Sequence, residues 1–212
     1  MSSVTNTELH QLPNGATVIF DPQDHIYTYN DYVLPSITTL IQNVYGNMYS
    51  AVNPELLQRA ADYGTAVHQE IQDLVELRDE ILGSIDPSIA QHQEVKNYFM
   101  FVEPIYKIQP IMMEKVVLLY NEEGNPVAAG RFDMFGLVAD KPTLIDLKTT
   151  STIHRQSVTA QLNLYLKGAR QCGYLSDYAN VDLGVVHLHG ETSRYVPITV
   201  LGDNFCKQFL PS

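Results

Sequence analysis

Several classes of protein are excluded by what this chain lacks. It has only two cysteines, Cys172 and Cys206, which are too few for a disulfide scaffold, a four-thiolate zinc site or an iron–sulfur cluster. No apolar run approaches the length needed to cross a bilayer, and residues 1–6 lack a basic segment followed by an apolar one. We therefore expect a soluble, cytoplasmic protein with no membrane partner, in which any metal is bound by oxygen and nitrogen atoms.

Basic residues are also scarce. The chain has 13 lysines and arginines against 24 aspartates and glutamates, which gives a formal net charge of −11. This surplus repels a phosphate backbone wherever it is exposed, so the composition argues against a protein that coats nucleic acid passively. It does not argue against an enzyme that acts on phosphates, because carboxylates that hold divalent cations attract phosphate once the cations are bound.

The composition of the chain indicates one compact domain of the α/β class. The 212 residues are 45% hydrophobic and include 13 tyrosines, which is ample for a buried core. We expect a mixed central sheet with helices on both sides. The single domain over 1–212 divides into an N-terminal hairpin and short helix (1–50), a helical part (51–110) and a sheet-rich part (111–212).

The N-terminal half is marked by turn formers and helix caps. Residues 16–34 read as a hairpin, because two β-rich runs flank turn-forming residues. Ser36 is the natural N-cap of a short helix that ends at Gly46. Asn53-Pro54 is a second N-cap with proline in the first turn, and it opens a long helix that reaches about Leu82.

The long helix places a histidine on its buried face. Apolar residues recur along it at helical spacing, and His68 belongs to this stripe, whereas Glu70 lies off it and is expected to be solvated. Asp86-Pro87 starts a further helix that continues through Ile105. Pro110 is expected to close the helical part.

Strand patterns dominate the remaining sequence. The predicted strands are 112–120, 127–138, 143–148, 181–189 and 195–200, and a helix is predicted over 156–172. The turns at 121–125 and 140–142 are short, so the first three of these strands should form a meander. Asp203 is expected to cap a short terminal helix.

Charged residues on two of these strands form a candidate site. Because side chains alternate along a strand, Asp133 shares one face with Arg131 and Phe135, and Asp146 shares one face with Lys148. If the faces coincide, two adjacent carboxylates repel each other unless a proton or cation lies between them, and a divalent metal is the simplest resolution. Lys148 could then position a water molecule or balance charge on a scissile phosphate. Carboxylate ligands suit Mg²⁺ or Mn²⁺, and an added histidine favours Mn²⁺.

Five motifs occur in one order along the chain. They are His25-Ile26-Tyr27 with Leu34-Pro35-Ser36-Ile37-Thr38, Gly64-Thr65-Ala66-Val67-His68, Gly130-Arg131-Phe132-Asp133, Ile145-Asp146-Leu147-Lys148-Thr149-Thr150 and Gln161-Leu162-Asn163-Leu164-Tyr165. Each alone is weak, but the ordered set resembles the PD-(D/E)XK nucleases, and within them the RecB-like exonucleases of phages and recombination machinery. Relatives with an iron–sulfur cluster need four cysteines, so the resemblance is to the cluster-free members.

The resemblance implies a restriction-endonuclease-like core over 111–212 and a role for each matched residue. His68, Asp133, Asp146 and the backbone carbonyl of Leu147 would bind Mg²⁺ or Mn²⁺, and Lys148 would orient or activate water. The remaining candidates are Gln161 and Tyr165, which could hydrogen-bond the phosphate or the lysine, and Glu114, which is similar to an extra glutamate of some members.

The implied activity is DNA exonuclease action on single strands or duplex ends, in phage-type recombination, repair or DNA processing. A recombination protein, a helicase or a single-strand-binding protein could be a partner. Two alternatives keep the fold: a structure-selective endonuclease with the same site, and a non-catalytic scaffold or binding protein.

Structural explanations stand beside the functional ones. Asp146 and Lys148 could form a surface salt bridge, and His68 could be a satisfied core histidine. Glu114 could have no role, and Gln161 and Tyr165 could be a polar edge and a core aromatic. His187 and His189 share a strand face without a carboxylate nearby in sequence, so we expect them to be structural or exposed.

Overall fold

The computed structural model describes residues 7–46 and 52–211. The strands are β1 (Glu8–Gln11), β2 (Thr17–Asp21), β3 (Ile26–Tyr29), β4 (Tyr32–Leu34), β5 (Ile108–Tyr120), β6 (Pro126–Val138), β7 (Lys141–Lys148), β8 (Asp182–His187) and β9 (Arg194–Ile198). The α-helices are α1 (Ile37–Tyr45), α2 (Pro54–Glu80), α3 (Gln93–Asn97), α4 (Glu103–Tyr106), α5 (Arg155–Gln171) and α6 (Asp203–Lys207). None of the helices in these ranges is both long enough and apolar enough to cross a membrane.

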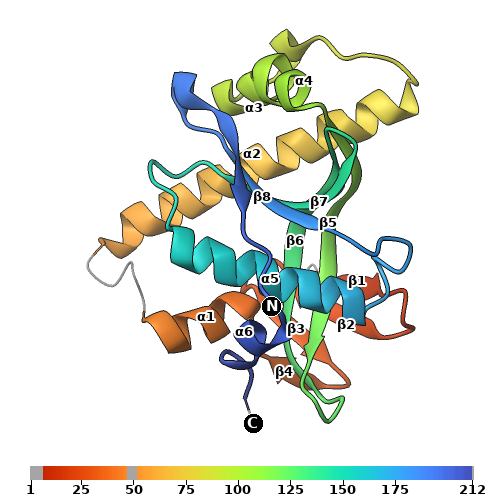
Figure 1. Cartoon of the computed structure of the whole chain (residues 1–212). Coiled ribbons are helices and arrows are strands. Elements are labelled where there is room, and N and C mark those ends of the chain that lie inside the picture. The colour runs from red at the N-terminus through yellow and green to blue at the C-terminus, as the bar shows by residue number, and fades with distance from the viewer. Residues whose placement is uncertain (1–6, 47–51, 212) are drawn as a thin grey trace.

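The larger sheet lies at the centre of the fold (Figure 1). It has five strands in the order β5-β6-β7-β8-β9, and all neighbours are antiparallel except β7 and β8, which run parallel. A parallel pair needs a crossover connection, and α5 provides it between β7 and β8. The predicted α/β class with a mixed central sheet is therefore confirmed, and so is the meander of β5, β6 and β7.

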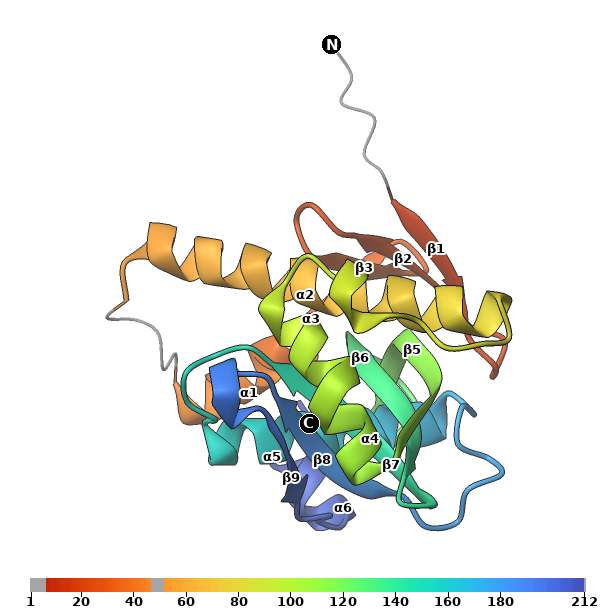
Figure 2. The same ribbon diagram turned by 90° about the horizontal axis from the view of Figure 1, so that it is seen from above.

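Helices cover both faces of this sheet, as predicted. Seen from above in Figure 2, α2 lies on one side of the sheet and α5 on the other. Along β7, Leu144 packs in the core with α1 and α5, whereas Ile145 and Leu147 pack in the core with α2. Such a strand is expected to be apolar on both sides. Asp146, which is only 2% exposed in the middle of it, is therefore an exception that calls for a functional explanation.

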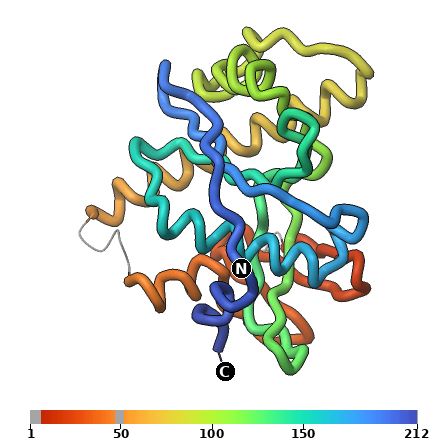
Figure 3. Tube along the Cα trace, viewed as in Figure 1, coloured from red at the N-terminus to blue at the C-terminus, as the bar shows by residue number. Residues whose placement is uncertain are grey.

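The N-terminal part forms a second sheet rather than the predicted hairpin. Four antiparallel strands follow one another in the order β1-β2-β3-β4, and the sequence predicted only β2 and β3. β1 is exposed and polar and β4 has only three residues, so neither carries the alternation that marks a strand. The amide of Ala129 in β6 donates to the carbonyl of Pro35 (3.0 Å), which holds the chain after β4 beside the larger sheet (Figure 3).

The predicted caps of the first two helices are confirmed. Ser36 Oγ accepts a hydrogen bond from the amide of Thr39 (3.0 Å), and Gly46 ends α1 with a φ of 80°. Asn53 Oδ1 accepts from the amide of Glu55 (2.8 Å), with proline at the first position of α2. These local bonds satisfy backbone groups that the first turn leaves unpaired. They therefore define where the long helix begins.

Three details of the prediction are wrong. The helix expected from residue 86 is a short 3-10 turn (Pro87–Ile89), and the main helix begins only at α3 and continues through a π-helical turn (Tyr98–Val102) into α4. Pro110 lies within β5, where an edge strand and a shift in register tolerate its missing N–H. Asp203 makes no capping bond in α6, because Gly202 occupies the N-cap and the Asp203 carboxylate binds Lys167 instead.

Candidate functional site

The β6–β7 pairing brings the two predicted aspartates together. Met134 pairs with Ile145, and Asp133 and Asp146 are the next residues of the two strands beyond this pair. The backbone N–H of Leu147 donates to Asp133 Oδ2 at 2.6 Å, so this carboxylate lies over the end of β7. The two aspartates therefore lie at the same end of neighbouring strands, and that they share one cation stays a prediction.

His68 reaches the same point from α2. Its Nδ1 lies 3.8 Å from Asp133 Oδ2 and 4.0 Å from Glu114 Oε1. One donor atom from each of these residues lies within 4.8 Å of the others. Ligand atoms about 2.1 Å from an octahedral cation are about 3 Å apart, so only a small adjustment would let the three side chains share one ion. This donor set of two carboxylates and one imidazole fits a divalent cation such as Mn²⁺.

Glu114 enters the site through an irregularity in β5. Its φ is 49°, which is uncommon for a residue other than glycine, and it interrupts the pairing between Met113–Met134 and Lys115–Phe132. Arg131 Nε donates to Glu114 Oε2 at 2.7 Å. Burial raises the pKa of Glu114 to about 8, the nearby Asp133 adds to this rise, and Arg131 opposes it. The residue with this unusual backbone conformation therefore carries a carboxylate in a place where it is poorly hydrated.

Asp146 carries an unsatisfied buried oxygen. Lys148 Nζ donates to Asp146 Oδ1 at 2.9 Å, but Oδ2 has no hydrogen-bond partner among the described residues and is shielded from solvent. Burial raises the pKa of Asp146 to about 6, Lys148 opposes this rise and Asp133 adds to it. A buried oxygen without a partner is costly, and a cation or a proton would relieve the cost. Asp146 nevertheless lies outside the tight group formed by His68, Glu114 and Asp133.

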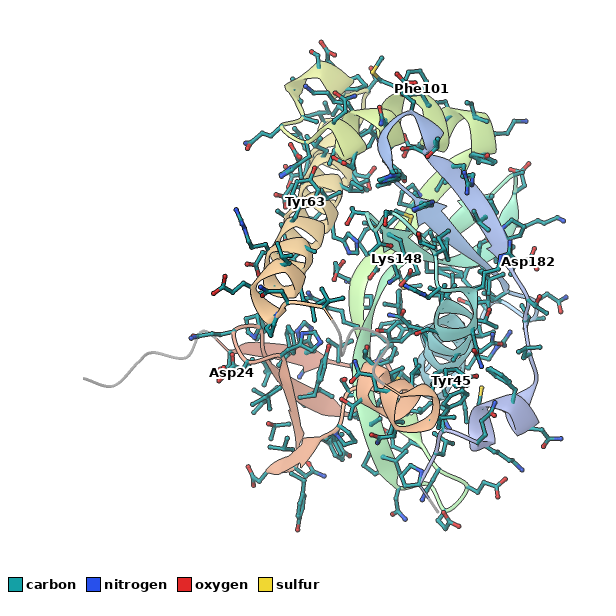
Figure 4. The ribbon with its side chains drawn as sticks, turned by 90° about the vertical axis from the view of Figure 1, so that its left-hand side faces the viewer. Asp24, Tyr45, Tyr63, Phe101, Lys148 and Asp182 are labelled. Atoms are coloured by element: carbon teal, nitrogen blue, oxygen red, sulfur yellow. The ribbon has the colours of Figure 1, made fainter. Side chains whose placement is uncertain are left out.

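A line of polar groups runs from Lys148 into α5. Lys148 Nζ lies 3.5 Å from Gln161 Oε1, and Gln161 Nε2 lies 3.5 Å from the hydroxyl of Tyr165. Both α5 residues occupy one face of the helix because they are four positions apart. The predicted neighbourhood of these side chains is therefore present. Figure 4 shows Lys148 between α2, which carries the labelled Tyr63, and α5.

The electrostatics favour a neutral histidine among acids. Burial lowers the pKa of His68 to about 4, the charge of Lys148 contributes to this, and Asp146 and a hydrogen bond with the backbone of Leu147 oppose it. Burial also raises the pKa of Asp133, although Lys148 and the Leu147 amide oppose that shift. A neutral imidazole can donate a lone pair to a metal. The site is thus suited to accept positive charge.

Two motif glycines permit the close packing behind the site. A Cβ at Gly130 would lie 2.7 Å from Tyr165 Cε1, so only glycine allows the α5 ring to rest against β6. A Cβ at Gly64 would lie 3.3 Å from Thr149 Oγ1, which is a tight approach between α2 and the end of β7. These contacts fix the distance between the two helices and the strands that carry the acids.

The site opens into a cavity of about 210 Å³ whose outer wall comes from the N-terminal sheet and α1. Its lining includes His25, Tyr27 and Thr38 in addition to His68, Glu114, Arg131 and Asp133. Sequence reasoning gave these three residues no role, although their segment belongs to the first of the ordered motifs. We refer to this space as the acidic cavity.

Other expectations near the site have different outcomes. Phe135, which was expected on the same strand face as Asp133, is buried in the core with its ring 4.9 Å from that of Tyr178. Glu70 is not solvated, because its carboxylate accepts hydrogen bonds from the amide and Nδ1 of His92. The expectation that His187 is structural fits its burial and the 2.6 Å contact between its Nε2 and the Thr150 carbonyl oxygen.

Comparison with known proteins adds little to this geometry. No family model matches the chain, and no curated protein matches it either. Among solved structures, the crystal structure of SSO0001 is similar with a TM-score of 0.42 and 15% sequence identity, covering 82% of this chain and 71% of that one. A likeness at this level bears on neither family nor activity.

Proposed function

We propose that this chain is a Mg²⁺- or Mn²⁺-dependent deoxyribonuclease that removes nucleotides from DNA ends. The observation that carries the proposal is the convergence of Asp133, Asp146 and Lys148 with His68 from a distant helix. His68, Glu114 and Asp133 line a cavity, and one buried carboxylate oxygen of the nearby Asp146 has no hydrogen-bond partner among the described residues. The order and spacing of the motifs that contain these residues, which resemble those of PD-(D/E)XK nucleases, also support it.

The donor set supports the choice of cofactor. His68, Asp133 and Glu114 would hold the ion, and Asp146 and the Leu147 carbonyl are its remaining candidate ligands. A divalent cation bound there would acidify water and offset the charge that develops on the phosphate. The scaffold alternative is disfavoured, because so many poorly hydrated acids are costly in a protein that binds no cation.

The chain's own residues supply position and charge. Lys148 would hold the attacking water or neutralise a phosphate oxygen, since its ammonium already lies 2.9 Å from Asp146. Gln161 would keep the lysine oriented, and Tyr165 would keep the glutamine in place. Arg131 neutralises Glu114 and so limits repulsion between that carboxylate and the substrate.

The net charge of −11 supports a local grip on DNA rather than an extended basic surface. The substrate would be single-stranded DNA or a duplex end in the cytoplasm. A recombination protein, a helicase or a single-strand-binding protein would supply further affinity for DNA. The exonuclease form of the activity rests on the motif resemblance, and the endonuclease alternative uses the same residues.

The test is digestion of end-labelled linear DNA with Mg²⁺ or Mn²⁺. Asp146→Asn and Lys148→Ala should each lower the rate at least about 100-fold, as removal of a transition-state contact does. Matched controls are Asp182→Asn and Lys141→Ala, which change exposed residues of β8 and β7. Equal rates in wild type and both site variants would refute the assignment.

Two further measurements separate the alternatives. Cleavage of closed circular DNA would indicate an endonuclease, because a circle offers no end. Calorimetric titration with Mn²⁺ tests the scaffold alternative, since a folded protein that binds no Mn²⁺ and cuts no DNA would be a binding protein.

A further inference from the structure

A second cavity adjoins the acidic cavity on the side of α5. It has a volume of about 250 Å³, and Thr38 and Gln161 line both cavities. Lys148 lines the second cavity, although its ammonium contacts Asp146 of the site. Thr38 and Gln161 therefore lie where the two cavities meet, and Lys148 lies in the wall of the second cavity.

The lining of the second cavity differs in charge from that of the first. Among the described residues that line it there is no aspartate or glutamate, whereas Glu114 and Asp133 line the acidic cavity. Its polar groups are the Lys148 ammonium, the hydroxyls of Thr150 and Ser157, and further side chains that can donate hydrogen bonds. In a chain with a net charge of −11, this is a place where a phosphate meets little repulsion.

The wall also has an apolar part. Ile153 and Val158 line the same cavity, and both also belong to or pack against the core formed with α5. A space that combines hydroxyl donors, one cation and an aliphatic surface suits a ligand with an anionic end and an apolar ring. A nucleotide has this character, because its phosphate is joined to a sugar and a flat base.

The loop that forms this wall is held in place. It connects β7 to α5, and within it Thr150 Oγ1 donates to the carbonyl of Thr152 (3.0 Å). The buried His187 of β8 makes a 2.6 Å hydrogen bond to the Thr150 carbonyl. The His187 bond fixes the backbone of the loop relative to the sheet, so the loop itself needs little reordering when a ligand binds, and only the Thr150 hydroxyl has to change its partner.

We propose that the second cavity is a subsite for the nucleotide next to the scissile phosphate of the DNA strand. The inference rests on the proposed nuclease function. Ser157 donates a hydrogen bond to the neighbouring phosphate, and the Thr150 hydroxyl does the same by turning from the Thr152 carbonyl to the phosphate. Ile153 and Val158 contact the sugar or base of that nucleotide. The strand passes from one cavity to the other beside Lys148, so the bond to be cut lies between a bound nucleotide and the acids.

The experiment removes either the hydroxyls or the charge of the phosphate. Wild type and the double variant Thr150→Val with Ser157→Ala digest a series of single-stranded oligonucleotides, each with one neutral methylphosphonate linkage at a different distance from the labelled end. For wild type, a neutral linkage next to the cleaved bond should raise KM about 10-fold, the effect of one charge-assisted contact. The double variant should show this higher KM with unmodified DNA and no further increase with the neutral linkage.

Two control variants keep the test independent of folding. Thr150→Ser keeps the hydroxyl and should retain the wild-type KM, whereas Thr28→Val removes a hydroxyl that lines neither cavity and should change nothing. Unchanged Tm values establish that the variants are folded, and Ser157→Ala alone replaces the pair if the Thr150→Val change lowers Tm.

The outcomes separate this inference from the activity on which it rests. If wild type cuts DNA and the double variant is slowed by the neutral linkage as much as wild type, the subsite is overturned and the nuclease assignment stands. If wild type cuts none of the substrates with either metal, the proposed function and the subsite fail together.

Discussion

Replacing Asp146 by asparagine should stabilise the metal-free protein while removing its activity. The side chain is 2% exposed, and burial raises its pKa from an ordinary 3.8 to about 6 despite the contact with Lys148. At ~1.4 kcal/mol per pH unit, the ionised carboxylate costs the folded state about 3 kcal/mol. Asparagine has nearly the same shape without the charge. The variant should therefore gain up to about 3 kcal/mol in free energy of unfolding at neutral pH.

The pH dependence of this gain has a definite sign. The folded protein holds the Asp146 proton up to a pH of about 6, whereas the unfolded chain releases it near 3.8. Between these values the folded state binds more protons, so this group makes wild-type stability fall as the pH rises. The difference between variant and wild type should be small at the acid end of this window and reach its full value above the folded pKa.

Urea denaturation in EDTA across this pH range measures the effect. Asp182→Asn, at an exposed position on β8, is the control and should follow wild type at every pH. Adding Mn²⁺ should raise the Tm of wild type more than that of Asp146→Asn, because metal binding favours the folded state of the protein with the stronger site. A variant that is less stable than wild type at neutral pH would show that the Lys148 contact outweighs burial and would refute the reasoning.

Two further substitutions test the framework around the site. Glu70→Gln should cost about 1–3 kcal/mol, because the carboxylate accepts bonds from the amide and ring of His92. Burial alone would raise the pKa of Glu70, but these hydrogen bonds and the one from Gln91 outweigh burial and lower it below its ordinary 4.5. The loss of unfolding free energy, measured by urea denaturation, should therefore be complete above pH 4.5 and disappear in stronger acid. Gly136→Ala should cost about 3 kcal/mol or more, because the new Cβ would collide with the Gln109 carbonyl. Gly83→Ala, whose new Cβ would meet its nearest atoms at an ordinary 3.6 Å, should leave Tm nearly unchanged, and equal Tm values for the two alanine variants would contradict the packing argument.

Local patterns in the sequence were sufficient to predict the central meander and its acids. Alternation of side chains along a strand, together with a short turn between β6 and β7, leaves few ways to pair Asp133 and Asp146. Lys148 follows at the next position on the same face. Helix caps are equally local, which is why the starts of α1 and α2 were predictable from Ser36 and Asn53.

The extent of the N-terminal sheet and the break before α3 escaped prediction. β1 and β4 are stabilised by pairing with β2 and β3 rather than by a pattern of their own. Local helix propensity likewise predicted a helix from residue 86, where the structure has a short 3-10 turn. In each case tertiary contacts outweighed a weak local signal.

The sequence alone therefore determined the strand faces, the caps and the type of ligand atoms, because these depend on residues close together along the chain. Only the tertiary structure decided that His68 of α2 reaches Asp133 and that Glu114, with its positive φ, adds a third donor. It also decided that a second cavity, with no acid among the described residues that line it, adjoins the first. These features depend on the packing of elements that are far apart in sequence. Hydrophobic periodicity and motif spacing do not specify how such elements pack against one another.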